Sequence, residues 1–206
     1  MGQAQVIDRI LNKKRGGFFI ECGALDGETR SNTLYFERER DWKGILIEAD
    51  PRNFEQVITK HRKAYSSPTC LAPSKHPTSV KFQQQQNMGH IVGELYNNSG
   101  GPELGAVLVV QCFPLLSYLK ALNVTTVDYF SLDVEGAEFD ILKQIPWKEV
   151  NIKTLSVEFI HNKVDKYSIK NYMKDQGYFV HSEVTHVQWL ANDFIFVRDD
   201  FYDTIQ

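Results

Sequence analysis

The stretch that decides the fold runs Val127-Asp128-Tyr129-Phe130-Ser131-Leu132-Asp133-Val134-Glu135-Gly136-Ala137-Glu138. Its first half is apolar enough for a strand buried on both faces, as strands of parallel sheets are. Asp133 follows this strand directly, and Glu135 lies in the turn after it. In an open α/β sheet, ligands bind beyond the carboxyl ends of the strands. We therefore expect Asp133 and Glu135 to face a ligand.

Strands and helices alternate along the chain from Gly17 onward. The predicted strands are 18–22, 44–48, 65–71, 79–83, 107–110, 127–132, 155–160, 179–189 and 194–197. The predicted helices are 31–42, 51–63, 114–122, 135–145 and 165–176. Alternation that closes with a hairpin predicts an α/β fold with a doubly wound sheet and an antiparallel C-terminal edge. With no repeat or linker, residues 1–206 are expected to form one domain with its core at about 17–197.

The segment 84–105 departs from this alternation. It contains a glutamine run, several glycines and the stretch Asn97-Asn98-Ser99-Gly100-Gly101-Pro102. Long loops in compact domains are typically functional or mobile. Two hypotheses follow: a disordered surface insertion, or a lid that orders over the site.

Composition limits the possible functions. A formal net charge of -3 favours no non-specific contact with nucleic acid, so we expect no nucleic-acid partner. Cys22, Cys70 and Cys112 form an odd set without CxxC spacing, which argues against a disulfide framework and a zinc site.

Targeting signals are also missing from the sequence. No apolar stretch is long enough to span a bilayer, and residues 1–15 are too polar for a signal peptide. A cytoplasmic location is expected for the chain as written, unless it is a fragment of a longer membrane-anchored protein. Composition predicts no oligomeric state.

Two more acids end predicted strands. The first strand runs into Glu21-Cys22-Gly23-Ala24-Leu25-Asp26-Gly27, where glycines permit a tight turn close to a ligand. The second ends at Glu48, which is suited to accept hydrogen bonds from ribose hydroxyls. Asp50, before Pro51, is suited instead to cap the next helix. The dinucleotide fingerprint GxGxxG is missing, which argues against an NAD-dependent oxidoreductase.

These motifs resemble the FkbM family of S-adenosylmethionine (SAM)-dependent methyltransferases. The resemblance rests on the glycine turn after Glu21 and on Asp133-Val134-Glu135-Gly136-Ala137-Glu138. The block Ser31-Asn32-Thr33-Leu34-Tyr35-Phe36-Glu37, with Trp42 and the strand ending at Glu48, is most similar to its animal, Star-like branch. The resemblance spans residues 17–197. It implies a Rossmann-like class I methyltransferase fold with a seven-stranded, mostly parallel sheet that binds SAM.

The resemblance also implies residue roles. Glu21 and the glycine turn would hold the methionine portion of SAM, Glu48 the ribose, and residues near Cys70 would border the adenine. The full cofactor-binding set is expected to be Glu21, Gly23, Ala24, Leu25, Asp26, Asn32, Glu48, Ala49, Cys70, Leu71 and Asp133.

Catalysis is expected where the acceptor meets the methyl group. The predicted catalytic residues are Asp133, Glu135, Glu158 and His161, with His161 as candidate general base because the unperturbed pKa of histidine lies near neutrality. The resemblance suggests an oxygen acceptor, whose identity the sequence does not give. We assign no metal site, although Asp133, Glu158 and Asn162 form an alternative set of oxygen ligands for Mg²⁺.

A different class of function is open as well. Proteins of the Star-like branch are associated with trafficking of membrane-bound ligands. The resemblance therefore also allows a non-catalytic binding or trafficking module on a methyltransferase fold.

Overall fold

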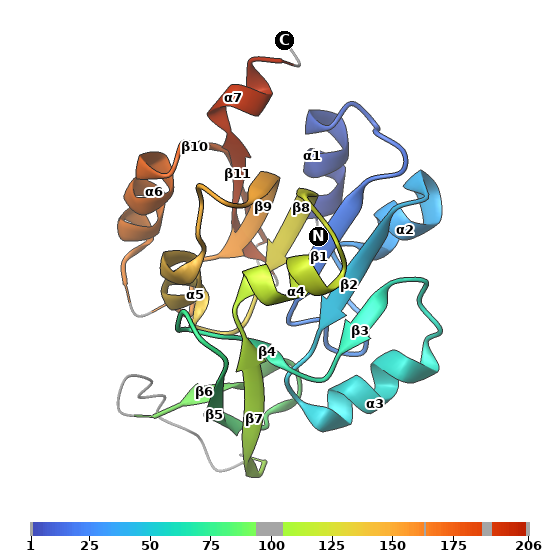
Figure 1. Ribbon diagram of the computed structural model, residues 1–206, viewed down its shortest axis with the longest axis vertical. Coiled ribbons are helices and arrows are strands. Elements are labelled where there is room, and N and C mark those ends of the chain that lie inside the picture. The colour runs from blue at the N-terminus through green and yellow to red at the C-terminus, as the bar shows by residue number, and fades with distance from the viewer. Residues whose placement is uncertain (1, 94–104, 163, 187–190, 205–206) are drawn as a thin grey trace.

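A seven-stranded sheet forms the centre of the computed structural model, which describes residues 2–93, 105–162, 164–186 and 191–204 (Figure 1). Its strand order is β10-β11-β9-β8-β1-β2-β3. The strands are β1 (Phe18–Cys22), β2 (Lys43–Ile47), β3 (Tyr65–Ser67), β8 (Thr126–Leu132), β9 (Asn151–Glu158), β10 (Tyr178–Thr185) and β11 (Asn192–Arg198). Pairing is parallel throughout except at β11, which runs antiparallel to both β9 and β10. The predicted mostly parallel sheet is confirmed, and its antiparallel strand lies one place inside the C-terminal edge.

Helices cover both faces of this sheet because successive strand residues point to opposite sides. Phe19 and Tyr129 pack into one buried cluster, whereas their neighbours Ile20 and Phe130 pack into the other. The first cluster is covered by α1 (Gln3–Ile10), α2 (Leu34–Arg40) and α3 (Pro51–Thr59). The second is covered by α4 (Leu115–Ala121), α5 (Glu138–Gln144) and α6 (Lys166–Asp175). A short helix, α7 (Asp199–Tyr202), follows β11.

The N-terminal helix belongs to this packing. Ile7 of α1 is fully buried, and the Gln3 side chain donates a hydrogen bond to Asp193 at the start of β11. The packed core therefore begins before Gly17. Among the helices that the structure describes, none is long and apolar enough to cross a bilayer.

A second, four-stranded sheet lies below the first in Figure 1 and was not predicted. Its strand order is β4-β7-β5-β6, formed by β4 (Cys70–Leu71), β5 (Thr78–Gln83), β6 (His90–Val92) and β7 (Val107–Phe113). The prediction of one third strand over 65–71 is wrong, because the chain leaves the main sheet after Ser67 and joins the second sheet at Cys70. Pro68 lies at this break and has no amide hydrogen for a strand ladder.

The segment 84–105 is only partly described. Its first part forms a short 3-10 helix, η1 (Gln86–Met88), and then β6, which pairs with β5. Residues 94–104, with Asn97-Asn98-Ser99, lie outside the described residues. The disordered insertion and the lid both stay hypotheses for that part.

A disulfide joins Cys70 of β4 to Cys112 of β7, contrary to our expectation that the cysteines are unpaired. The two residues are direct partners in the β4–β7 register, with Cα atoms 4.3 Å apart. They are 42 positions apart in sequence, so their spacing gave no signal. Cys22 is free and buried.

Reduction of this disulfide should destabilise the domain. Closing a loop of 42 residues lowers the entropy of the unfolded chain, by an amount equivalent to about 4 kcal/mol at most. We expect urea unfolding with reductant to show a loss of about 2–4 kcal/mol. A Cys70→Ala/Cys112→Ala variant should no longer respond to reductant, whereas Cys22→Ala should keep the response. A wild-type protein indifferent to reductant would contradict the disulfide.

Candidate functional site

A cavity opens at the carboxyl ends of β1, β2, β8 and β9. The strand order reverses between β1 and β8, the topological switch point where open α/β sheets bind ligands. Most predicted site residues line this cavity: Glu21, Gly23, Ala24, Leu25, Asn32, Glu48, Ala49, Cys70, Leu71, Asp133, Glu135, Glu158 and His161. Asp26 is the exception. Its carboxylate accepts hydrogen bonds from Glu28 and Thr29 and so stabilises the turn.

Glu48 bridges the loops that follow β1 and β2. Its Oε2 accepts a hydrogen bond from the Leu25 amide at 2.7 Å, and its Oε1 accepts one from the Asp50 amide at 2.8 Å. Burial raises the pKa of Glu48 to about 7, against the effect of these two bonds. Asp50 caps α3 by accepting from the Arg52 amide, and it also accepts from the Gln84 side chain. Glu48 is therefore the acid directed at the cavity, and Asp50 has the structural task predicted for it.

The raised pKa of Glu48 predicts a pH-dependent stability. Because its pKa is higher in the folded protein than in the unfolded chain, the folded state binds more protons between pH 4.5 and about 7. Stability contributed by protonated Glu48 is therefore lost as pH rises through this window, by about 2–3 kcal/mol. Urea unfolding should show that, between pH 5 and pH 8, the free energy of unfolding of wild type falls by about 2–3 kcal/mol more than that of Glu48→Gln. The exposed variant Glu55→Gln should behave like wild type, and parallel profiles for wild type and Glu48→Gln would refute the effect.

Glu21 is fully engaged by the loop that precedes α2. Its carboxylate accepts hydrogen bonds from the Ser31 hydroxyl, the Asn32 amide and the Thr33 hydroxyl. Burial raises its pKa despite these bonds. The Asn32 side chain in turn donates to the Ser131 hydroxyl of β8. Glu21 therefore shapes the cavity wall by holding this loop against the sheet.

Gly23 is required by the protein backbone itself. Its φ is +81°, and a Cβ at this position would lie 1.7 Å from the carbonyl oxygen of Asp133. The sequence pattern predicts that this glycine permits a tight turn close to a ligand. The contact with Asp133 shows that the fold needs the glycine as well, because a side chain here would push apart the ends of β1 and β8.

Four carboxylates gather after β8 and β9. Asp133, Glu138 and Glu158 offer oxygens that lie within 4.8 Å of one another, and Glu135 approaches Glu158 through His161. Glu138 is fully buried and accepts hydrogen bonds from the amides of Val134 and Gly136. Burial, and then the charge of Glu158, raise the pKa of Glu138 to about 8, and the same two causes raise that of Asp133. Such a cluster requires protons or cations for neutralisation.

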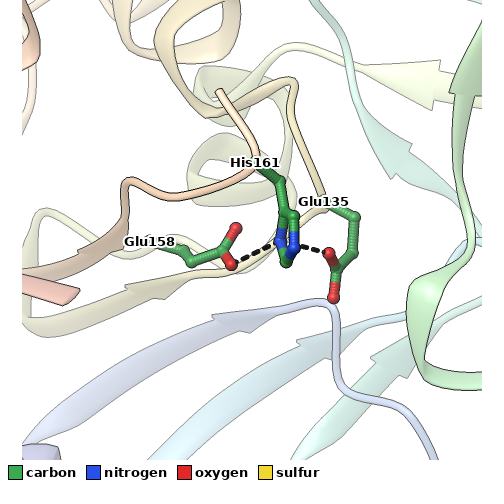
Figure 2. A group of neighbouring side chains, drawn as sticks. All are labelled: Glu135, Glu158 and His161. Carbon is green, nitrogen blue, oxygen red and sulfur yellow. Dashed lines mark ion pairs between the residues drawn. The ribbon is translucent and has the colours of Figure 1, made fainter. Parts of the chain in front are cut away.

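His161 lies between two of these carboxylates (Figure 2). Its Nδ1 is 2.7 Å from Oε2 of Glu135 and 2.6 Å from Oε1 of Glu158. Hydrogen bonding to Glu135 and then to Glu158 raises the pKa of His161 to about 10. The expectation of a general base rested on a pKa near neutrality, and the two carboxylates hold the pKa of His161 well above that value.

Asn162 has a structural task. Its Oδ1 accepts from the Phe139 amide, and its Nδ2 donates to the carbonyl of Glu158. These bonds tie the start of α5 to the end of β9. In the alternative Mg²⁺ set of Asp133, Glu158 and Asn162, the side-chain oxygen of Asn162 therefore already accepts a hydrogen bond from the backbone.

Several lining residues were missed by sequence reasoning. Asp193, the second residue of β11, pairs in register with Glu158 and has a pKa raised to about 6 by burial. Because β11 is antiparallel, its first residues lie at the same edge as the last residues of β9. A lone acid at the start of an apolar strand was the available signal. Phe82, Met88 and Ile91 add apolar lining from the second sheet and η1, where no sequence pattern marked a contact with the site.

Comparisons with known proteins agree with this architecture. A crystal structure of a methyltransferase FkbM from Methylobacillus flagellatus superposes with a TM-score of 0.58 at 14% identity, covering 88% of this chain and 43% of that one. The chain thus spans less than half the length of that relative. A structure from Streptococcus pneumoniae, described as a candidate tRNA (m1A22) methyltransferase, gives a TM-score of 0.51 at 8% identity, covering 96% of this chain and 70% of that one.

These likenesses show the class I methyltransferase fold. A search of curated protein sequences gives no match. The sequence model of the methyltransferase FkbM domain, however, matches residues 21–180, which is most of the chain. The chain therefore belongs to the FkbM methyltransferase domain family.

Proposed function

We propose that the protein binds SAM and transfers its methyl group to an oxygen acceptor. The observation that carries this proposal is Glu48, a buried carboxylate at the end of β2 that lines the same cavity as the glycine turn and Asp133. Each of its oxygens retains a lone pair beyond the backbone bond that it accepts. A carboxylate in this place can therefore accept both hydroxyls of a ribose.

The other lining residues divide the cavity into three parts. The turn Gly23–Leu25, with Asn32, Asp133 and the loop held by Glu21, is proposed to hold the methionine portion. Ala49, Cys70 and Leu71 are proposed to border the adenine, and the disulfide joins Cys70 in that wall to Cys112 of β7. We leave Asp26 out of the proposed set because it does not line the cavity.

The carboxylates beyond the methionine portion would serve the reaction. An acceptor oxygen attacks the methyl carbon in line with the carbon–sulfur bond, which breaks to release S-adenosylhomocysteine. The proton of a hydroxyl acceptor must pass to a base. We propose Asp133 or Glu158 for this task and expect Asp133→Asn to lower turnover far more than it lowers stability. This carboxylate-lined end would repel a phosphodiester backbone, so a polyanionic acceptor such as tRNA is disfavoured.

Calorimetric titration tests the proposal. We expect the protein to bind SAM and S-adenosylhomocysteine and to give no heat with NAD. Incubation of the protein with SAM and each of a panel of hydroxyl compounds should then convert SAM to S-adenosylhomocysteine. Binding of NAD with no binding of SAM would refute the assignment.

A non-catalytic binding or trafficking module, as suggested by the Star-like resemblance, is the second candidate. One observation is consistent with it: Glu48 accepts hydrogen bonds from two backbone amides, so its carboxylate has partners within the protein itself. Failure to bind either SAM or NAD would support this candidate.

The disulfide bears on the compartment. Disulfides form and persist mainly in oxidising compartments and are rare in the cytosol. We infer from Cys70–Cys112 that the domain works in an oxidising compartment, contrary to the cytoplasmic location expected from the sequence. Detection of free Cys70 in protein purified from its natural source without reductant would refute this inference.

A further inference from the structure

Three potential ligand atoms converge at the carboxyl end of β9. Nδ1 of His161 faces carboxylate oxygens of both Glu135 and Glu158 at 2.6–2.7 Å (Figure 2). A single ring nitrogen carries at most one hydrogen, so it can donate to only one of these oxygens. A cation in the midst of the three atoms would bind all of them at once.

Glu158 provides an independent sign of a missing partner. The residue is 7% exposed and lines the cavity, and its Oε2 accepts no hydrogen bond from any residue that the structure describes. Buried carboxylate oxygens normally have partners, because desolvation without one is costly. Further acids are close to Glu158, since Asp133, Glu138 and Glu158 offer carboxylate oxygens that lie within 4.8 Å of one another. One histidine cannot neutralise this group.

We propose that Glu135, Glu158 and His161 bind one divalent first-row transition-metal cation. Carboxylate oxygens suit Mn²⁺ and Mg²⁺, and an imidazole ligand shifts the preference toward the transition metals. At ligand distances of about 2.1 Å, neighbouring ligands of a six-coordinate ion are about 3 Å apart. The observed separations of 2.6–2.7 Å therefore have to widen by only a few tenths of an ångström.

The backbone holds these three residues in place. Glu135 has a left-handed φ of +58°, and the following Gly136 packs so closely that a Cβ there would lie 2.9 Å from the carbonyl oxygen of His161. Asn162 joins the same two loops through its bonds to Phe139 and Glu158. Ligands fixed by their surroundings lose little freedom on binding an ion.

The cation would also define the acceptor, a consequence that rests on the proposed function. Three protein ligands leave up to three positions of a six-coordinate ion open to the cavity. A hydroxyl oxygen bound there has a lowered pKa and is held for attack on the methyl carbon. A compound with neighbouring hydroxyl groups would occupy two adjacent positions of the ion, and we assign the acceptor to this class. One hydroxyl would give its proton to Asp133 and form the new oxygen–carbon bond as the carbon–sulfur bond of SAM breaks.

Mn²⁺ titration of the whole chain without SAM tests the site, with electron paramagnetic resonance reporting the loss of free ion. We expect one Mn²⁺ per chain, and an affinity at least tenfold weaker in Glu158→Gln and in His161→Ala. The controls Glu55→Gln and His76→Ala change exposed residues that do not line the cavity, so they should bind like wild type.

Two results of the Mn²⁺ titration would overturn the proposal. One is no binding of Mn²⁺ to wild type, and the other is equal affinity of wild type and both site variants. Circular dichroism checks that each variant is folded, and His161→Gln replaces any variant that is not. Because the titration omits SAM, it stands or falls separately from the calorimetry that tests the proposed function.

Discussion

Gly23→Ala is expected to destabilise the protein by about 4 kcal/mol or more. The added Cβ would lie 1.7 Å from the carbonyl oxygen of Asp133, a contact that only movement of the backbone can relieve. This movement would separate the ends of β1 and β8, where the Asp133 amide donates to the Cys22 carbonyl. The left-handed φ of +81° adds about 1–2 kcal/mol of strain.

Gly177→Ala is the matched control for this prediction. Gly177 has a φ of +82°, and a Cβ there would meet no atom of the described residues within 4 Å. Its alanine variant should therefore show only the conformational strain. Urea unfolding of both variants separates the two contributions. A Gly23→Ala variant no less stable than Gly177→Ala would mean that the β1–β8 junction is not packed as described.

Glu48→Ala should weaken SAM binding by about 10²- to 10⁴-fold. The Glu48 carboxylate would accept two charge-assisted hydrogen bonds from the ribose, each worth about 1.5–3 kcal/mol. Asp50→Ala should weaken binding by less than tenfold, because Asp50 caps α3 and binds Gln84. Calorimetric titration with SAM, at a temperature well below the unfolding temperatures of the two variants, measures both affinities.

The loss of backbone bonds needs its own control here. Glu48→Ala also leaves the amides of Leu25 and Asp50 without their acceptor, which by itself can loosen the glycine turn. Glu48→Gln keeps one oxygen for one of these amides and removes the charge. It should bind SAM better than Glu48→Ala and worse than wild type. Equal affinities of the Glu48 and Asp50 alanine variants would remove Glu48 from the ribose site.

Local patterns were enough to predict the main sheet. Strand residues alternate between two buried clusters, so β1, β2 and β8 are mostly apolar, and a glycine or an acid follows the last residue of each. The same rule placed Glu48 and Asp133 at the cavity, because parallel strands deliver their carboxyl ends to one edge. One helix cap followed from a single residue, Asp50 before α3.

Long-range pairing was beyond these patterns. The turn at Pro68 sends Cys70 into a second sheet, and the pairing of β4 with β7 then places it opposite Cys112. The antiparallel course of β11 brings Asp193 beside Glu158. Neither contact leaves a trace in the spacing of residues, because each depends on which strands become neighbours.

The sequence by itself thus determined the fold class, the edge of the sheet that carries the site and the acids that end its strands. These features depend on burial of local apolar runs and on strand direction, which neighbouring residues encode. Only the tertiary structure decided how the acids are used. It engaged Glu21 with its own loop, turned Asp26 away from the cavity and set His161 between Glu135 and Glu158. The protonation of these groups follows from desolvation and from charges brought together by folding, and neither exists in the unfolded chain.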